Sequence, residues 1–138
     1  MYKRQESTNA DLNSKNVGGL VGFAEGDVRA SYSGVTVTAH AAAVQVRAGG
    51  LIGWLNNGTI TASYAAGAVS GGSPGSNSAS GGLAGVVSAS TITASYATGY
   101  VMAATSTSIG GLAGRVVGGA RVINSYCCLL YTSPSPRD

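Results

Sequence analysis

The chain has 138 residues, of which 44% are hydrophobic and 9% are charged, and its formal net charge is +3. Its length suits one domain or a slice of a longer array. The near balance of charge supports neither a nucleic-acid partner nor a charged membrane surface. No apolar run approaches the roughly 20 residues that span a bilayer, so no membrane insertion is expected. Abundant Gly, Ala, Ser, Thr and Val favour a narrow interior built from short strands.

Both ends of the chain resemble translated sequencing adapter of the transposase type. Residues 1–5 read MYKRQ and residues 128–138 read CLLYTSPSPRD, which are reading frames of the two adapter strands. We therefore expect residues 1–5 and 127–138 to be adapter-derived and outside the fold, and the reading frame to be truncated on both sides. Cys127 shares its codon with the adapter, so no disulfide or cysteine-based metal site is predicted. Positions 6–126 hold five basic and four acidic residues, a net charge of +1.

Two short phrases recur along positions 17–126 with one period. Gly-Gly-Leu-x-Gly appears four times, its first glycines lying 31, 32 and 29 residues apart, and a tyrosine follows each copy after 14 to 16 residues. Two markers locked to a period near thirty predict one supersecondary unit copied along an axis. The structural motif residues are Gly19, Leu20, Gly22, Gly50, Leu51, Gly53, Gly82, Leu83, Gly85, Gly111, Leu112 and Gly114, and the tyrosines are Tyr32, Tyr64, Tyr96 and Tyr126.

Each repeat is predicted to form up to three short strands, separated by turns at which glycine or asparagine supplies a positive φ. In chain order, the strands are expected at 17–23, 28–32 and 35–39, then 48–55, 59–64 and 67–70, then 82–87, 91–96 and 99–102, and finally 109–116 and 121–126. Turns are expected at 25–27, 56–58 and 118–119. Positions 70–80 have the composition of a flexible loop, and positions 39–43 are expected to leave the coil with a helical turn.

These elements predict an all-β fold, a β-solenoid of the parallel β-helix kind with about four coils of roughly 30 residues. The four motif leucines would stack as one internal column, and a second column would contain Val28, Ile60, Ile92 and Val122. Positions 6–16 are expected to be a partial preceding repeat or a linker. Uncapped coil ends predict self-association, because free sheet edges template pairing.

At the Gly-Leu-x-Gly cores the chain resembles the GLUG-motif repeat family. The cores are residues 19–22, 50–53, 82–85 and 111–114, and the Ser-Tyr-Ala-x-Gly phrase of that family is matched at 63–67 and 95–99 and shortened at 31–34. Such repeats occur in large secreted or surface-attached bacterial proteins, including adhesin-like and haemagglutinin-like proteins. They also occur in immunoglobulin-cleaving peptidases whose catalytic residues lie outside the repeats. The resemblance implies an extracellular location and neighbouring repeats as partners, with a host or matrix protein or a glycan as ligand.

The sequence predicts no catalytic residue, no metal site and no cofactor. His40 is the only histidine, and nothing near it supplies a nucleophile or a second metal ligand. Glu25 and Asp27 favour a solvated polar turn over a carboxylate pair or a calcium site. The glycine phrases lack the Lys-Ser/Thr of a phosphate-binding loop. We therefore expect a protein that is not an enzyme.

The tyrosine column and the alternating threonines are the candidates for recognition. Stacked tyrosine rings could hold a sugar or a partner protein, or close the coil edge; the parity that they share with the apolar column favours packing. Thr36, Thr38, Thr59, Thr61, Thr91 and Thr93 could form an ice-binding face, although outward threonine is also ordinary strand filler. Asn57-Gly58-Thr59 fits a glycosylation sequon but is first a turn signal.

Three functions are compatible with this sequence. The leading hypothesis is a non-enzymatic structural or adhesive segment of a bacterial secreted or cell-surface protein. The second is a non-catalytic accessory region of a large secreted peptidase. The third is a solenoid face that binds carbohydrate or ice directly.

Overall fold

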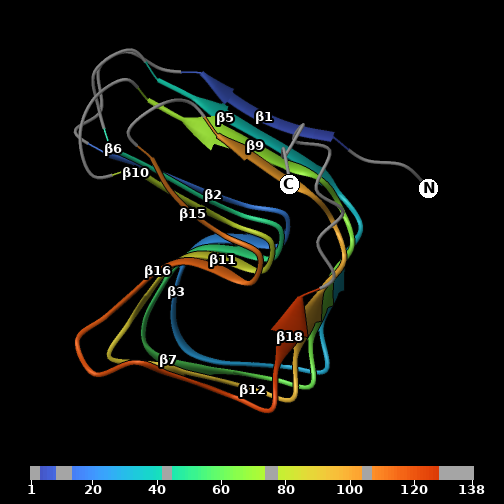
Figure 1. Ribbon diagram of the computed structural model, residues 1–138, viewed down its shortest axis with the longest axis vertical. Helices are drawn as coiled ribbons and strands as arrows, with labels where there is room; N and C mark the ends of the chain where they lie inside the picture. The colour runs from blue at the N-terminus through green and yellow to red at the C-terminus, as the bar shows by residue number, and fades with distance from the viewer. Residues whose placement is uncertain (1–3, 9–13, 42–44, 74–77, 104–106, 128–138) are drawn as a thin grey trace, which may run out of the picture.

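The computed structural model describes residues 4–8, 14–41, 45–73, 78–103 and 107–127. Within these ranges the chain forms strands and no helix, and every strand pair is parallel. The strands stack into parallel sheets as a β-solenoid, which confirms the predicted fold (Figure 1). The described residues contain no helix long and apolar enough to cross a membrane.

Each turn of the solenoid passes through four sheets, which we name A, B, C and D in the order in which the chain enters them. Sheet A contains β1 (Arg4–Thr8), β5 (Thr36–His40), β9 (Val69–Gly72) and β14 (Val101–Ala103). Sheet B contains β2 (Ser14–Gly18), β6 (Gln45–Gly49), β10 (Ser78–Gly81) and β15 (Thr107–Gly110). Sheet C contains β3 (Val21–Arg29), β7 (Ile52–Thr61), β11 (Ala84–Ser88), β12 (Thr91–Thr93), β16 (Ala113–Val117) and β17 (Arg121–Ile123). Sheet D contains β4 (Tyr32–Ser33), β8 (Tyr64–Ala65), β13 (Tyr96–Ala97) and β18 (Tyr126–Cys127).

The cross-section of the solenoid is visible in Figure 1, where equivalent strands of successive levels overlie one another. Sheet A covers one side, and sheet B runs from it towards the middle of the molecule. There the chain reverses and returns along the first part of sheet C, then turns outward along the second part. Sheet D connects the end of sheet C back to sheet A. Each sheet is four levels deep, so residues that are paired in register lie about 4.8 Å above or below one another.

The Gly-Gly-Leu motif lies at the sharp reversal between sheets B and C, and not inside one strand as predicted. Residues 50–51 form a bend that separates β6 from β7. A Cβ on Gly49 would lie 1.9 Å from the Ile52 carbonyl oxygen, and one on Gly50 would lie 2.2 Å from the Gly82 oxygen. The chain can reverse this tightly only where both side chains are absent. Each turn of the solenoid therefore contributes strands to four sheets, whereas three strands per turn were expected.

The predicted turns at 25–27 and 56–58 are instead bulges inside long strands. The pairing of β3 with β7 shifts register between Glu25 and Asp27, and Gly26 has a φ of 106°. On β7 two residues, Asn57 and Gly58, lie opposite Gly26, and Asn57 has a φ of 51°. Positions 118–119 do form a turn, with φ values of 64° and 75°. An extra residue in a left-handed conformation is absorbed locally while the ladder continues on both sides.

Three segments expected to leave the coil contribute strands to it. Within 70–80, β9 extends to Gly72 and β10 begins at Ser78, while positions 74–77 lie outside the described residues. Ser73, Ser78 and Ser80 are fully buried there. Positions 39–40 end β5, and 42–44 lie outside the described residues. Strand β1 includes positions 4–5 and β18 includes position 127, so these terminal positions take part in the sheets.

Two apolar clusters fill the interior. One lies inside sheets C and D and contains Leu51, Ile52, Leu55, Ile60, Ala65, Leu83, Ala84, Val87, Ile92 and Ala97. The other lies between sheets A and B and contains Val17, Val37, Ala39, Val46, Ala48 and Val69. The predicted leucine column is confirmed, since the Leu51 amide donates to the Leu83 carbonyl at 2.9 Å and the Leu83 amide to Leu112 at 2.8 Å. The second column is confirmed by the register of Ile60 with both Val28 and Ile92.

Close packing at the reversal predicts that Gly82→Ala is strongly destabilising. A Cβ at position 82 would lie 2.1 Å from the Gly111 oxygen and 2.9 Å from the Ala97 Cβ, and neither neighbour can retreat without breaking the stack. We expect the free energy of unfolding to fall by about 3 kcal/mol, measured by urea titration. Gly34→Ala is the matched control, because no atom lies within 4 Å of a Cβ there, and it should change stability by less than about 0.5 kcal/mol. Equal effects of the two substitutions would contradict this packing.

Candidate recognition face

Four tyrosines form a continuous ladder along sheet D. Tyr32 pairs in register with Tyr64, Tyr64 with Tyr96, and Tyr96 with Tyr126. The ring centroids are 5.3, 5.0 and 5.6 Å apart, and the ring planes differ by 11°, 3° and 10°. The spacing of the rings follows the spacing of the strands that carry them. The predicted tyrosine column is therefore confirmed.

The tyrosine rings stack on one another on the outer side of sheet D, although the parity that they share with the apolar column would place them on the side of Ile60. Ile60 is fully buried, whereas Tyr64, four residues later, is only partly buried. The alternation of inward and outward side chains is interrupted between them, because Ala62 has a φ of 50° and turns the chain. Ser63 then faces the interior, with 1% of its surface exposed, and its neighbour Tyr64 faces outward.

A ladder of serine hydroxyls holds this corner, and sequence reasoning missed it. The Ser63 hydroxyl donates to the Thr61 carbonyl at 2.9 Å and accepts from the Ser31 amide at 3.2 Å. The Ser95 hydroxyl likewise donates to the Thr93 carbonyl at 2.8 Å and accepts from the Ser63 amide at 3.2 Å. Each serine thus satisfies backbone groups in two coils at once, which fixes the direction of the following tyrosine. The signal was present, because a serine precedes every one of the four tyrosines.

The ladder exposes ring edges and hydroxyls, and not ring faces. Tyr64 and Tyr96 have a tyrosine on each side at 5.0 to 5.6 Å, which leaves no room for a sugar ring between them. Only the end rings have a free face, and Tyr32 and Tyr126 are 66% and 64% exposed. None of the four hydroxyls forms a hydrogen bond to another described residue. The row therefore offers regularly spaced phenol edges, whose donors and acceptors are not used by the described part of the chain.

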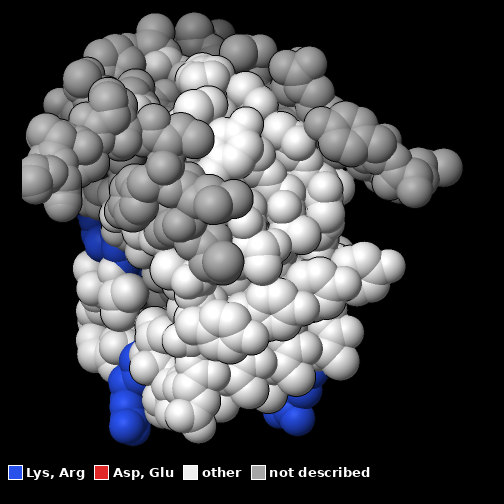
Figure 2. All heavy atoms as spheres, turned by 45° about the vertical axis from the view of Figure 1, so that its right-hand side comes forward, with Lys and Arg blue, Asp and Glu red and all other residues white. Residues whose placement is uncertain are grey.

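The surface around sheet D carries almost no charge. Figure 2 views the molecule from the side on which sheet D lies; no acidic residue is visible among the coloured atoms, and basic residues appear only towards the lower and left margins. Two further large apolar side chains of the fourth level, Tyr100 and Met102, are about half exposed. An uncharged, aromatic surface with free hydroxyls is typical of recognition surfaces.

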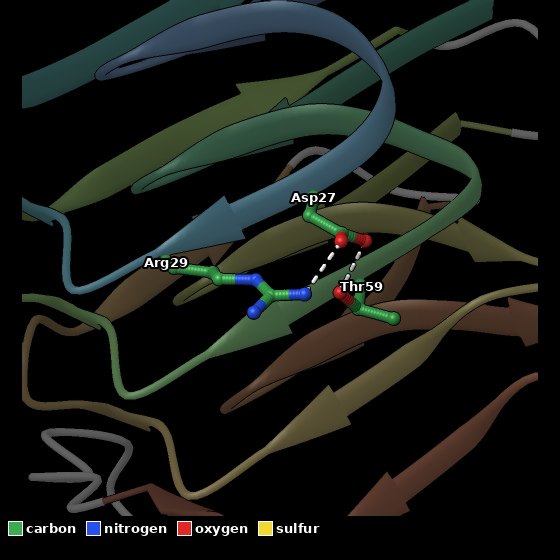
Figure 3. Close-up of polar contacts among 3 residues, drawn as sticks. All are labelled: Asp27, Arg29 and Thr59. Atoms are coloured by element: carbon green, nitrogen blue, oxygen red, sulfur yellow. Dashed lines mark hydrogen bonds and ion pairs between the residues drawn. The ribbon is translucent and has the colours of Figure 1, made fainter.

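The charged groups gather instead on the outer side of sheet C. Asp27 accepts a hydrogen bond from the Arg29 guanidinium at 2.7 Å and one from the Thr59 hydroxyl at 2.6 Å (Figure 3). The hydrogen bond from Thr59, and the bond and charge of Arg29, hold the pKa of the Asp27 carboxyl below its ordinary value of 3.8. Glu25 accepts from the Asn56 amide at 3.0 Å. The predicted solvated polar segment is found, and among the described residues no three His, Cys, Asp or Glu side chains gather as a metal site.

The threonines do not make one extended flat face. Two register rows cross the outer side of sheet C, the first containing Asp27, Thr59, Thr91 and Arg121 and the second containing Arg29, Thr61, Thr93 and Ile123. Threonine therefore covers only the two middle levels, and charged residues stand at the ends of the first row. Thr36 and Thr38 lie in a different sheet, on β5. This arrangement does not fit the ice-binding face that the alternation suggested.

The remaining predicted residues have structural positions. Leu51 and Leu83 line the interior, whereas Leu20 at the first level is 49% exposed. The last glycine of each motif lies against sheet B, as at Gly53, where a Cβ would be 2.6 Å from the Val17 nitrogen. His40 is exposed at the end of β5, and its carbonyl accepts from the Lys15 ammonium at 3.3 Å. Asn57 is exposed at its bulge.

A cation–π pair across the reversal was also missed. The Arg47 guanidinium carbon lies 4.4 Å from the centre of the Trp54 ring, and Arg47 donates to Asn16 at 3.0 Å and to Gln45. Burial, and the like charge of Arg115, lower the pKa of Arg47 below its ordinary value. Arg47 and Trp54 lie on opposite sides of the sharp bend, and no local sequence pattern predicts that bend. The cation–π contact joins sheet B to sheet C.

Comparison with known proteins gives no match: no family model, no curated protein and no solved structure resembles this chain closely enough to be counted. The resemblance to GLUG-motif repeats therefore stays a prediction from the motifs themselves.

The ladder predicts a difference between inner and outer tyrosines. Tyr96 has two stacked neighbours and Tyr32 has one. We expect Tyr96→Ala to lower the free energy of unfolding by about 3 kcal/mol and Tyr32→Ala by about 1 kcal/mol, since each aromatic pair contributes about 0.5–1.5 kcal/mol beyond its buried area. Chemical denaturation of both variants measures the difference. A larger loss for Tyr32→Ala would rule out a stabilising ladder.

Proposed function

We propose that this chain is a non-enzymatic structural and adhesive segment of a bacterial secreted or cell-surface protein. The tyrosine ladder of sheet D is its contact surface, and the ligand is a host or matrix protein or a glycan. The observation that carries the proposal is the ladder itself: four outward rings at 5.0–5.6 Å spacing on an uncharged face.

The repeat architecture supports a structural role. Similar corners and columns recur from level to level, so the fold can lengthen by adding coils that continue the tyrosine row. Such a rod holds attached domains apart while it displays one surface repeatedly. The similarity of the motifs to GLUG repeats supports the extracellular location. An accessory role beside a secreted peptidase would use the same rod and the same face.

The mode of contact follows from the stacking. Because neighbouring rings cover the faces of Tyr64 and Tyr96, a ligand meets these residues through ring edges and hydroxyls. A glycan or a polypeptide that runs along the solenoid axis would place successive polar groups against successive hydroxyls. Contacts repeated over several levels strengthen binding by multivalency, although each contact is weak.

Binding to matrix proteins and to a glycan array tests this proposal. The double variant Tyr64→Phe/Tyr96→Phe removes two hydroxyls and keeps the stacked rings, so folding should be unchanged. If each hydroxyl contributes a net hydrogen bond of about 1 kcal/mol, affinity should fall by at least about tenfold. The matched control Thr61→Ala/Thr93→Ala removes two hydroxyls from sheet C and should leave affinity unchanged. Binding that is lost in the control and kept in the tyrosine variant would reject sheet D as the contact surface.

A further inference from the structure

The two inner tyrosines of the ladder are held in a geometry that favours oxidative coupling. Tyr64 and Tyr96 are paired in register on the parallel strands β8 and β13, and they are the closest and most nearly parallel of the three neighbouring pairs, at 5.0 Å and 3°. We propose that these two residues are a covalent cross-linking site, at which a haem peroxidase with hydrogen peroxide, as the one-electron oxidant, joins the rings as dityrosine. This inference is independent of what sheet D binds.

The reactive part of each ring lies on the outer side of the solenoid. Tyr64 and Tyr96 belong to the middle levels, so each ring has a stacked neighbour on both faces and is partly buried by them. Neither hydroxyl forms a hydrogen bond to another described residue. An oxidant in solution can therefore take an electron at the ring edge, and the hydroxyl proton can pass to water, without breaking a contact inside the protein.

Register brings equivalent ring carbons together. Because the two strands are parallel and the ring planes differ by 3°, each ring carbon beside a hydroxyl faces its equivalent at about the ring separation of 5.0 Å. The backbones are held in place by the serine corner, where the Ser63 amide donates to the Ser95 hydroxyl at 3.2 Å. The rings can close the remaining gap by rotation about their side-chain bonds, which is fast at a protein surface. Holding both reactants side by side turns a slow encounter between two phenols into a step within one molecule.

The coupling balances with the oxidant alone. Each phenol loses one electron and its hydroxyl proton, which leaves a radical whose unpaired electron is shared with the ring carbons beside the oxygen. Two such radicals form one carbon–carbon bond. The hydrogen on each bonded carbon then moves to the oxygen through water, which restores both phenols. In total two tyrosines lose two hydrogen atoms, and one hydrogen peroxide accepts them and becomes two water molecules.

The bond would join two consecutive coils. Tyr64 and Tyr96 are 32 positions apart, so the cross-link closes one whole repeat into a covalent loop. Like a disulfide, it would restrict the unfolded chain and thereby stabilise the fold. Thiols exchange with disulfides but do not cleave a carbon–carbon bond, so this link would persist where a disulfide would be reduced.

Two double variants of the full chain test the site. Tyr32→Phe/Tyr126→Phe keeps Tyr64 and Tyr96 as neighbours, whereas Tyr32→Phe/Tyr96→Phe keeps Tyr64 and Tyr126, which lie two strand spacings, about 10 Å, apart. Both variants carry the same number of phenols and keep all the stacked rings. After treatment with a haem peroxidase and hydrogen peroxide, the monomeric fraction is isolated, and its dityrosine is measured by fluorescence. The variant with neighbouring tyrosines should contain at least about tenfold more dityrosine per chain.

Peptide mapping of the oxidised, unmodified chain is the second measurement, and it needs no substitution. Mass spectrometry should find a peptide pair that links Tyr64 to Tyr96 and has lost two hydrogen atoms. This pair, together with the difference between the two variants, supports the site. Circular dichroism before oxidation compares the β-structure of each variant with that of the unmodified chain.

Two results would overturn the inference. Equal yields in the two folded variants would show that coupling does not depend on neighbouring positions in the ladder. A monomeric fraction of the unmodified chain without the linked peptide pair would show that the stacked rings do not couple, even if cross-linked dimers form between molecules.

Discussion

The structure depends on one constraint: each coil must lie in register directly over the next. Register is maintained by backbone hydrogen bonds that join equivalent residues one repeat apart, such as Leu51 to Leu83. It is enforced by the reversal between sheets B and C, where the backbone of one coil lies so close to its neighbours that a Cβ on Gly50 or Gly82 would fall within 2.2 Å of an oxygen atom. A coil that slipped by one residue would drive a side chain into this space. Glycine therefore acts here through close packing more than through flexibility.

The outer surface inherits this constraint. Because equivalent residues lie above one another, any residue type repeated in the sequence becomes a row on the surface. The tyrosines form such a row because a serine hydroxyl and a left-handed alanine fix the corner before each of the two inner ones. The same rule places Asp27 and Arg121 at opposite ends of one row. The surface proposed for recognition on sheet D thus arises from the repeat itself.

The period and the columns could be predicted from the sequence because they need only the spacing of like residues. The direction of side chains could not, since alternation assumes an extended strand and Ala62 interrupts it with a φ of 50°. Positions 70–72 and 78–80 were expected to belong to a loop, because small polar residues suit both a flexible linker and a tightly packed interior, and Ser78 and Ser80 belong to the second class. The Arg47–Trp54 contact depends on a reversal that no local pattern specifies.

The most direct test of the account measures scalar couplings across backbone hydrogen bonds by NMR. The in-register stack predicts couplings from the Leu51 amide nitrogen to the Leu83 carbonyl carbon and from the Leu83 nitrogen to the Leu112 carbon, which join donors and acceptors one repeat apart. Couplings that link these leucines reciprocally to partners within their own repeat, as in antiparallel hairpins, would contradict the solenoid and every surface derived from it.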